Sequence, residues 1–187
     1  MADRIPVLEC ITLTVSEECA ADPIQFREIL EIADRMKQQG MTGQFWGPTT
    51  EKRNRFVWFL LKTLADDAME SLCFHFRKHL PLKVLNAPTT EIDIYTIKEG
   101  HTRGEVERTW SAVARSIEGT EGHVATSWGD VRQSEGQPGQ GIWICGWESV
   151  EAHMNQGGTN EEFRRTGEDA VTLVANLEAA HAKLQAY

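Results

Sequence analysis

The stretch GIWICGWESVEAHM, Gly141 to Met154, has the pattern of an apolar strand that runs directly into a helix. The stretch FVWFLLKTLADDAM, Phe56 to Met69, has the same pattern and aligns with it without a gap, 85 residues earlier. The alignment places Trp58 against Trp143. We therefore interpret the chain as a duplicated unit with one such strand–helix corner in each half.

The first half shows strands by their β-branched and apolar runs and helices by apolar residues at helical spacing. The pattern predicts strands at Val7–Val15, Thr42–Trp46 and Phe56–Leu61, helices at Pro23–Gly40 and Ala65–Lys78, and a short extended piece at Leu82–Leu85.

The second half repeats this order and then continues into a long C-terminal segment. The pattern predicts strands at Glu91–Ile97, Gly122–Trp128 and Ile142–Trp147, helices at Thr102–Ile117 and from Ser149, and a helical segment at Asn160–Ala186. On the last strand of the unit, Trp143, Cys145 and Trp147 are expected on one face and Ile142, Ile144 and Gly146 on the other.

Each half therefore follows the order β-α-β-β-α, which is ferredoxin-like and belongs to the α+β class. Helices cover one face of such a sheet, so the other face needs a partner, and the simplest partner is the sheet of the other half. We expect an intramolecular α+β barrel with a space between its sheets. The expected parts are residues 1–88 and 89–159 as the two halves and residues 160–187 as a C-terminal helical extension.

The repeated order and the motif GWESVEAHM, in which a strand ends in Trp-x-Ser before a helix with an early histidine, resemble the dimeric α+β barrel superfamily. More narrowly they resemble its antibiotic-biosynthesis-monooxygenase-like and stress-responsive members. In that family two small chains usually pair, so the resemblance implies that both partners are fused here. It also implies a range of functions, including polyketide cyclases, cofactor-free monooxygenases and proteins without a known reaction.

The composition of the chain argues against some classes of binding partner. The chain has 187 residues and a formal net charge of -9, which disfavours nucleic acid and an anionic membrane surface. The sequence has no apolar run of the roughly 20 residues that a membrane helix needs. No secretory signal is expected at the start, and the four cysteines show no metal or disulfide spacing, which favours the cytoplasm. A homodimer through the C-terminal helix is a further expectation.

Three residues of the second half are candidates for catalysis, and for two of them, His123 and His153, the first half lacks a histidine at the matching position. His123 begins a strand on which it is expected to share a face with Ser127, and an imidazole titrates near neutral pH. His153 lies one turn into its helix, where the resemblance implies a histidine in related cyclases. Tyr95 is a candidate hydrogen-bond donor to a substrate carbonyl. A solvated histidine and a buried tyrosine are the structural alternatives.

Aromatic residues supply a candidate pocket for a flat ligand. Ser127 is added to the expected substrate-binding set, which is otherwise composed of tryptophans on strands or strand ends: Trp46, Trp128, Trp143 and Trp147. Packing in the core is the alternative for each of them.

No metal or cofactor site is expected. His75 and His79 are spaced for one face of a helix, but HFRKH places two cations between them and lacks a further ligand. The loop SEGQPGQG, Ser134 to Gly141, lacks the glycine spacing of a phosphate loop.

The leading hypothesis is a cofactor-independent enzyme in which His123 and His153 act as acid and base on an apolar aromatic or polyketide-like metabolite, with Tyr95 orienting a carbonyl. The reaction would be a cyclisation, isomerisation or dehydration. A cofactor-free monooxygenase is the first alternative, and a non-catalytic ligand-binding or stress-associated barrel with a filled interior is the second.

Overall fold

The computed structural model describes residues 5–22, 26–35, 40–64, 73–76, 81–131 and 139–187. The first half contains four strands, β1 (Ile5–Thr14), β2 (Met41–Pro48), β3 (Arg55–Leu64) and β4 (Cys73–Phe76), and two helices, α1 (Glu17–Ala21) and α2 (Arg27–Arg35). Its sheet has the order β4-β1-β3-β2, and every neighbouring pair is antiparallel.

The short helix α3 (Leu82–Leu85) connects the two halves, and the second half has the same sheet order, β8-β5-β7-β6. Its strands are β5 (Thr89–Ile97), β6 (His123–Val131), β7 (Gln140–Trp147) and β8 (Val174–Ala182). Its helices are α4 (Arg103–Ile117), α5 (Val150–Thr159) and α6 (Glu161–Thr172), and a short strand, β9 (Gln185–Ala186), ends the chain. None of the helices in these described ranges is long and apolar enough to cross a membrane.

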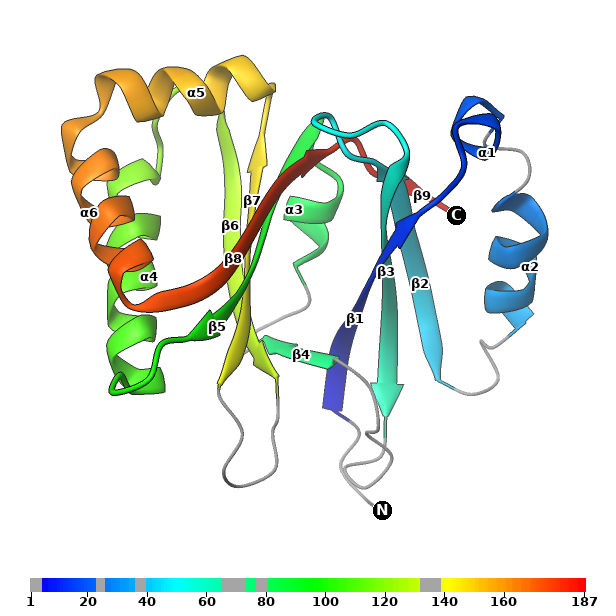
Figure 1. The fold of residues 1–187 in the computed structure, drawn as a ribbon, viewed down its shortest axis with the longest axis horizontal. Coiled ribbons are helices and arrows are strands. Elements are labelled where there is room, and N and C mark those ends of the chain that lie inside the picture. Colours follow the sequence, from blue (N-terminus) through cyan, green and yellow to red (C-terminus); the bar gives the residue numbers. More distant parts are fainter. Residues whose placement is uncertain (1–4, 23–25, 36–39, 65–72, 77–80, 132–138) are drawn as a thin grey trace.

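The two sheets join into a barrel because each half lends its last strand to the other (Figure 1). β4 of the first half pairs with β6, where Phe74 lies opposite Val131. The chain after β8 crosses in the opposite direction: Ala182 pairs with Thr90 of β5 and bridges to Thr49, and β9 then pairs with β2. The predicted intramolecular α+β barrel is therefore confirmed.

Apolar side chains pack together in the barrel interior, between the two sheets. Strand alternation sends Phe59 inward from β3 and Ile142 and Ile144 inward from β7, and all three are fully buried. α3 lies between the two halves (Figure 1) and adds Val84 and Leu85 to the same cluster. This close approach needs Gly146, since a Cβ there would lie 2.7 Å from the Cβ of Ala87.

The helices cover the outer faces of the sheets. α4 begins with a capping box, in which the Glu105 backbone N–H donates to the Thr102 hydroxyl and the Thr102 backbone N–H donates to the Glu105 carboxylate. The predicted apolar face of α4 is confirmed as buried: Val106, Trp110, Val113 and Ile117. It packs on Trp143, Cys145 and Trp147, which share the outer face of β7 as predicted.

Three element predictions are wrong. Cys73–Phe76, predicted as part of a helix, is strand β4, while residues 65–72 and 77–80 of that predicted helix lie outside the described part. Leu82–Leu85 is a helix instead of an extended piece. The predicted C-terminal helix ends at Thr172, because the following residues pair with β5 as the fourth strand of the second sheet.

Candidate aromatic cleft and histidine chain

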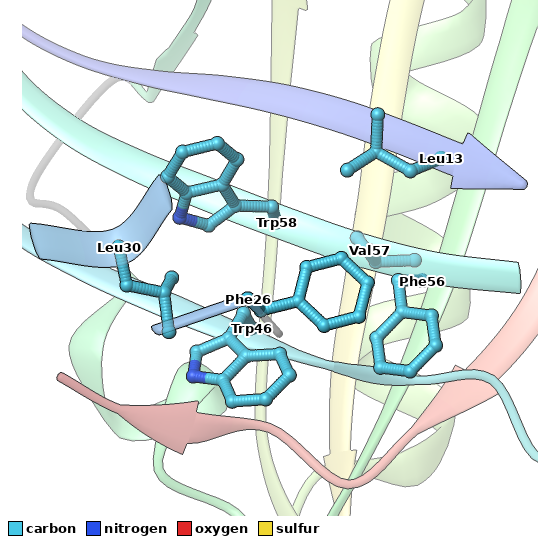
Figure 2. A pocket seen from close by; sticks show the side chains of 7 residues that line it. All are labelled: Leu13, Phe26, Leu30, Trp46, Phe56, Val57 and Trp58. Atoms are coloured by element: carbon cyan, nitrogen blue, oxygen red, sulfur yellow. The ribbon is translucent and has the colours of Figure 1, made fainter. Parts of the chain in front are cut away.

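A cleft lies under α2, on the outer face of the first sheet. Its inner end is a hollow of about 10 Å³ in which the rings of Phe26, Trp46 and Phe56 lie close together (Figure 2). The ring centroids of Phe26 and Phe56 are 4.7 Å apart, and those of Phe26 and Trp46 are 5.6 Å apart. The hollow is lined by Leu13, Phe26, Leu30, Trp46, Phe56, Val57 and Trp58.

The cleft continues outward as an open groove of about 400 Å³, which is within the usual range for small-molecule sites. Leu30, Trp46 and Phe56 line both parts. The groove adds Arg27 from α2 and the C-terminal residues Gln185, Ala186 and Tyr187, together with Gly47 and Pro48. Its walls are therefore mainly apolar and aromatic, with one cation from α2 among the lining residues.

Backbone contacts hold these walls in place. Trp46 lies opposite Trp58 in the β2–β3 register, and Gln185 pairs with Trp46 on the other side of β2. Gly47 allows the C-terminal segment to come close, because a Cβ at this position would lie 2.2 Å from the carbonyl oxygen of Lys183. The buried Gln44 side chain donates to the Leu30 carbonyl at 3.0 Å and so ties α2 to the sheet.

The second half has the same arrangement, but its own side chains fill it. Trp128 lies opposite Trp143 in the β6–β7 register, as Trp46 lies opposite Trp58. The indole of Trp110 on α4 stacks on Trp143 at 4.7 Å. The buried residues of the two helices share one spacing, which places Leu30 of α2 where α4 carries Trp110: Phe26, Leu30 and Ala33 against Val106, Trp110 and Val113.

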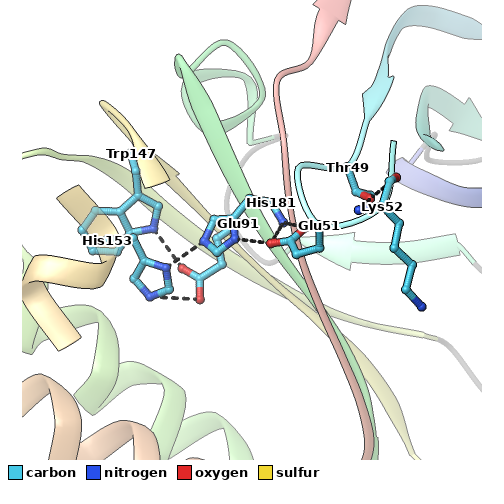
Figure 3. Close-up of polar contacts among 7 residues, drawn as sticks. All are labelled: Thr49, Glu51, Lys52, Glu91, Trp147, His153 and His181. Atoms are coloured by element: carbon cyan, nitrogen blue, oxygen red, sulfur yellow. Dashed lines mark hydrogen bonds and ion pairs between the residues drawn. The ribbon is translucent and has the colours of Figure 1, made fainter. Parts of the chain in front are cut away.

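A chain of polar contacts crosses from the second half to the first (Figure 3). His153 Nδ1 and His181 Nε2 are 2.8 Å apart. His153 Nε2 faces Glu91 at 3.5 Å, and the Trp147 indole N–H donates to Glu91 at 2.9 Å. On the other side, His181 Nδ1 is 2.7 Å from Glu51, in the loop between β2 and β3.

His123 does not lie where the alternation of β6 predicted. The register with β7 shifts between His123 and Ala125, and this bulge turns the imidazole to the helix-covered face. There His123 Nε2 is 2.8 Å from the Thr126 hydroxyl, and its ring meets Trp147 edge-on at 5.6 Å. Burial, and then the charge of Lys83, lower the pKa of His123.

His123 and His153 are brought to one indole but not to each other. His153 stacks on Trp147 at 4.9 Å, while His123 touches the same indole edge-on. Burial, and then the neighbouring His181, lower the pKa of His153, whereas Glu91 raises it. Their proposed role as an acid–base pair stays a prediction.

The other predicted site residues fall into three places. Tyr95 is buried against Trp110, with ring centroids 5.5 Å apart, and burial raises the pKa of its phenol. Trp128 and Trp143 join this outer cluster, with ring centroids 5.8 Å apart, while Ser127 is on the inward face of β6. Trp46 alone of the predicted tryptophans lines the open cleft of the first half as described.

Two carboxylates lie side by side on the outer face of β5. Asp93 is 7% exposed, and its Oδ1 has no hydrogen-bond partner. Burial, and then the charge of Glu91, hold the pKa of Asp93 well above its ordinary value. Burial also raises the pKa of the Cys10 thiol to about 12, which argues against this thiol as a nucleophile.

Within the described ranges, no group of three histidine, cysteine or acidic side chains is placed to hold a metal ion. His79 and the side chain of His75 lie outside that description.

Sequence reasoning missed His181, Glu91 and Glu51. His181 lies in the segment that was predicted to be helical, and Glu51 reaches it from 130 residues away. Glu91 was noted merely as part of a strand. Glu91 lies opposite His181 in the β5–β8 register, and the closing of the barrel brings Glu51 to His181; neither follows from a local sequence pattern.

No protein-family model matches the sequence, and no curated protein matches it significantly. Solved structures do match. An anthrone oxidase-like protein superposes with a TM-score of 0.71 at 11% identity, over 100% of this chain and 95% of that one. A provisionally assigned monooxygenase from Fusobacterium nucleatum gives a TM-score of 0.65 at 9% identity, over 97% and 94% of the two chains.

A ferredoxin-fold protein of Listeria monocytogenes, described as related to antibiotic biosynthesis monooxygenases, gives a TM-score of 0.59 at 9% identity. The superposition covers 98% of this chain and 96% of that one. At such identities the similarity establishes the fold alone. The chain therefore has the fused α+β barrel fold of the antibiotic-biosynthesis-monooxygenase-like ferredoxin-fold proteins.

Proposed function

We propose that this chain binds a flat, mainly apolar aromatic molecule in the cleft under α2 and oxidises it with molecular oxygen, without a cofactor. The observation that carries the proposal is the comparison of the two halves. In the second half an indole, Trp110, stacks on Trp143. In the first half the smaller Leu30 occupies the matching helix position, beside an open groove of about 400 Å³.

The contents of the cleft suit this class of ligand. Trp46 and Phe56 offer ring faces for stacking, and stacking adds about 0.5–1.5 kcal/mol to the burial of apolar area. Arg27 adds a positive charge among the lining residues. A guanidinium stabilises an aromatic oxyanion, so the cleft favours a phenol or an enolisable aryl ketone over a plain hydrocarbon.

The proposed reaction converts an activated methylene between two aryl rings into a ketone. Water at the open mouth takes one proton, and Arg27 stabilises the resulting anion. The anion gives its electrons to oxygen, a carbon–oxygen bond forms, and protonation yields a hydroperoxide. Loss of water then leaves the carbonyl, so that one oxygen atom stays in the product and the other leaves as water. The similarity to an anthrone oxidase-like protein supports this choice of substrate class.

The test is turnover of a hydroxylated anthrone under ¹⁸O₂, followed by mass spectrometry against the uncatalysed rate. We expect one labelled oxygen atom in the product. Trp46→Leu should weaken binding about tenfold through lost stacking. Arg27→Gln should lower kcat/KM about fivefold to tenfold through the lost charged contact.

Arg165→Gln is the matched control, because Arg165 makes the same kind of exposed i, i+4 ion pair with Asp169 that Arg27 makes with Glu31. It should turn over like the unmodified chain. Turnover that continues under nitrogen would instead favour the acid–base alternative, a cyclisation, isomerisation or dehydration involving His123 and His153. Binding without any turnover would contradict both enzymatic proposals and favour a binding protein.

A further inference from the structure

The polar chain Glu51–His181–His153–Glu91, here called the histidine seam, joins the two halves where the barrel closes (Figure 3). His181 is on β8 and Glu51 is in the loop between β2 and β3. The Glu51 carboxylate also accepts the His181 backbone N–H at 3.0 Å, and the Thr50 backbone N–H donates to the His181 carbonyl at 2.7 Å. His181 is therefore fixed to the first half by its ring and by its backbone.

The contacts of the ring nitrogens limit how many protons the two histidines of the seam can bind without breaking their contact. The carboxylate of Glu51 can only accept, so His181 Nδ1 carries a proton, and Nε2 of the neutral ring is an acceptor. His153 Nδ1 must then donate across the 2.8 Å contact. His153 can still take a second proton on Nε2, which faces Glu91. A further proton on His181 Nε2 would place two N–H groups and two positive charges against each other, and the contact could not persist.

The surroundings of both rings are defined. His153 packs against Trp147 and Phe163, which also contact each other, and it faces the charges of Glu91 and His181. Its side chain is 17% exposed, and that of His181 is 12% exposed. The side chain facing His181 from the first half is Glu51. Asp93 follows Glu91 on the same face of β5. Glu178 precedes His181 on β8 and forms an ion pair with Arg55.

The pKa values of His153 and Glu51 are both lowered in the folded chain. Burial and the neighbouring His181 lower the pKa of His153 below 6.5, so the folded state resists its protonation. Burial alone would raise the pKa of Glu51, but the hydrogen bonds from His181 bring it below its ordinary value. The contribution of His153 to stability is therefore present above pH 6.5 and is lost as the pH falls through its lowered pKa.

The strand that carries His181 continues directly into the wall of the cleft. After Ala182, which bridges to Thr49, Lys183 passes close over Gly47. Gln185 then pairs with Trp46, and Gln185, Ala186 and Tyr187 line the groove. If His181 separates from His153, this segment loses an anchor next to the cleft.

We propose that the His153–His181 contact is a proton-sensitive latch, which holds the C-terminal segment to α5 of the second half at neutral pH and releases it from α5 on acidification, so that the outer wall of the cleft loosens. The regulation of the cleft rests on the proposed function, whereas the latch itself does not.

Amide hydrogen exchange at pH 7.5 and pH 5.0, corrected for intrinsic rates, tests the latch. The protection factor of residues 181–187 should fall by at least about tenfold at pH 5.0, relative to that of α4, since the segment opens locally. In His153→Gln, whose amide can donate to His181 but cannot gain a charge, the fall should be less than about twofold. If His153→Gln does not fold, His181→Gln takes its place, and the same small fall in protection is expected.

Glu178→Gln is the control for general loosening, because it removes the Arg55–Glu178 ion pair from the same strand. It should lower protection equally at both pH values and leave the pH dependence intact. Equal protection of residues 181–187 at both pH values in the unmodified chain would overturn the latch. The same pH-dependent fall in His153→Gln and His181→Gln would also overturn it.

Binding of 2-naphthol, which is neutral over this range, tests the link to the cleft. Its Kd should rise at least about threefold from pH 7.5 to pH 5.0 in the unmodified chain and stay constant in His153→Gln, because the wall of the cleft opens only in the former. If exchange shows opening but the Kd does not change, the proposed control of the cleft is wrong. If 2-naphthol binds at neither pH, the proposed function fails, and the exchange result still decides the latch.

Discussion

At the scale of single residues, the carboxyl of Asp93 is in a place that disfavours its charged form. Its carboxyl is buried, one oxygen lacks a partner, and Glu91 lies beside it. Its raised pKa means that it contributes stability below pH 3.8 that is lost as the pH rises. Asp93→Asn should therefore increase the free energy of unfolding at pH 7 by about 1–3 kcal/mol.

Urea unfolding at pH 7 and pH 3.5 measures this effect. The gain should disappear at pH 3.5, where the unfolded Asp93 is also largely protonated. Asp169→Asn is the control, since Asp169 is exposed on α6 and should change stability by less than about 0.5 kcal/mol. An equal or lower stability of Asp93→Asn at pH 7 would contradict the assignment of Asp93 as a destabilising buried acid.

Some residues of the candidate site could be placed from the sequence, and others could not. Tyr95 and Trp143 were named as candidates from their strands, and their strands are correct. The prediction that His123 shares a face of β6 with Ser127 was wrong. One bulge places His123 on the opposite face, and the sequence HVATSW gives no sign of this bulge. The partners of His153 were not predictable, because His181 lies in a segment predicted to be helical, and it is opposite Glu91 only because that segment pairs with β5 as a strand.

At the scale of elements, strands with strong apolar alternation and the capped helix α4 were predictable. The C-terminal segment was not. Its alanines and leucines favour a helix, yet Val174–Ala182 is a strand because pairing along β5 outweighs local propensity. Asn176, with a φ of 51°, accommodates the bulge in this pairing, a conformation that asparagine tolerates better than most residues.

The comparison of α2 with α4 gives an element-scale prediction. Trp110→Leu should convert the filled second half into a copy of the first, with an open space beside Trp143. The variant should lose about 3 kcal/mol of stability, as large-to-small core changes do. Indole should restore part of this loss by binding in the space, which would appear as a rise of the melting temperature with indole concentration.

Leu30→Ala on α2 is the companion variant, because it enlarges a site that is already open. Indole should stabilise this variant no more than the unmodified chain, whereas it should stabilise Trp110→Leu by several degrees more. If indole raises the melting temperatures of Trp110→Leu and of the unmodified chain equally, the proposed equivalence of the two helix faces is wrong.

At the scale of the whole molecule, the duplicated corners were enough to predict a barrel within one chain. They were not enough to predict its interior. Whether a barrel holds a space depends on side-chain volumes from both halves at once, such as Phe59 and Phe74 against Ile142 and Ile144. The helix α3 adds Leu85 to the same interior, and it was predicted as an extended piece. An open groove lies outside the barrel, under α2.

This architecture predicts how a separated half behaves. Residues 88–187 contain a complete four-stranded sheet, but alone they would expose Ile92, Ile142 and Ile144, which the first half now covers. In the full chain the last strand of each half pairs with the matching edge strand of the other, β4 with β6 and β9 with β2. Two copies of the fragment can repeat this exchange. The fragment should therefore form a homodimer, detected by light scattering after gel filtration.

Ile144→Glu in the fragment should abolish the dimer and the cooperative thermal transition together, because a charge would then lie in the shared interior. Val171→Glu should leave both unchanged, since Val171 is 50% exposed on α6. A fragment that unfolds cooperatively as a monomer would show that each sheet is stable with its inner face in water. In that case, the shared interior would not be what holds the two halves together.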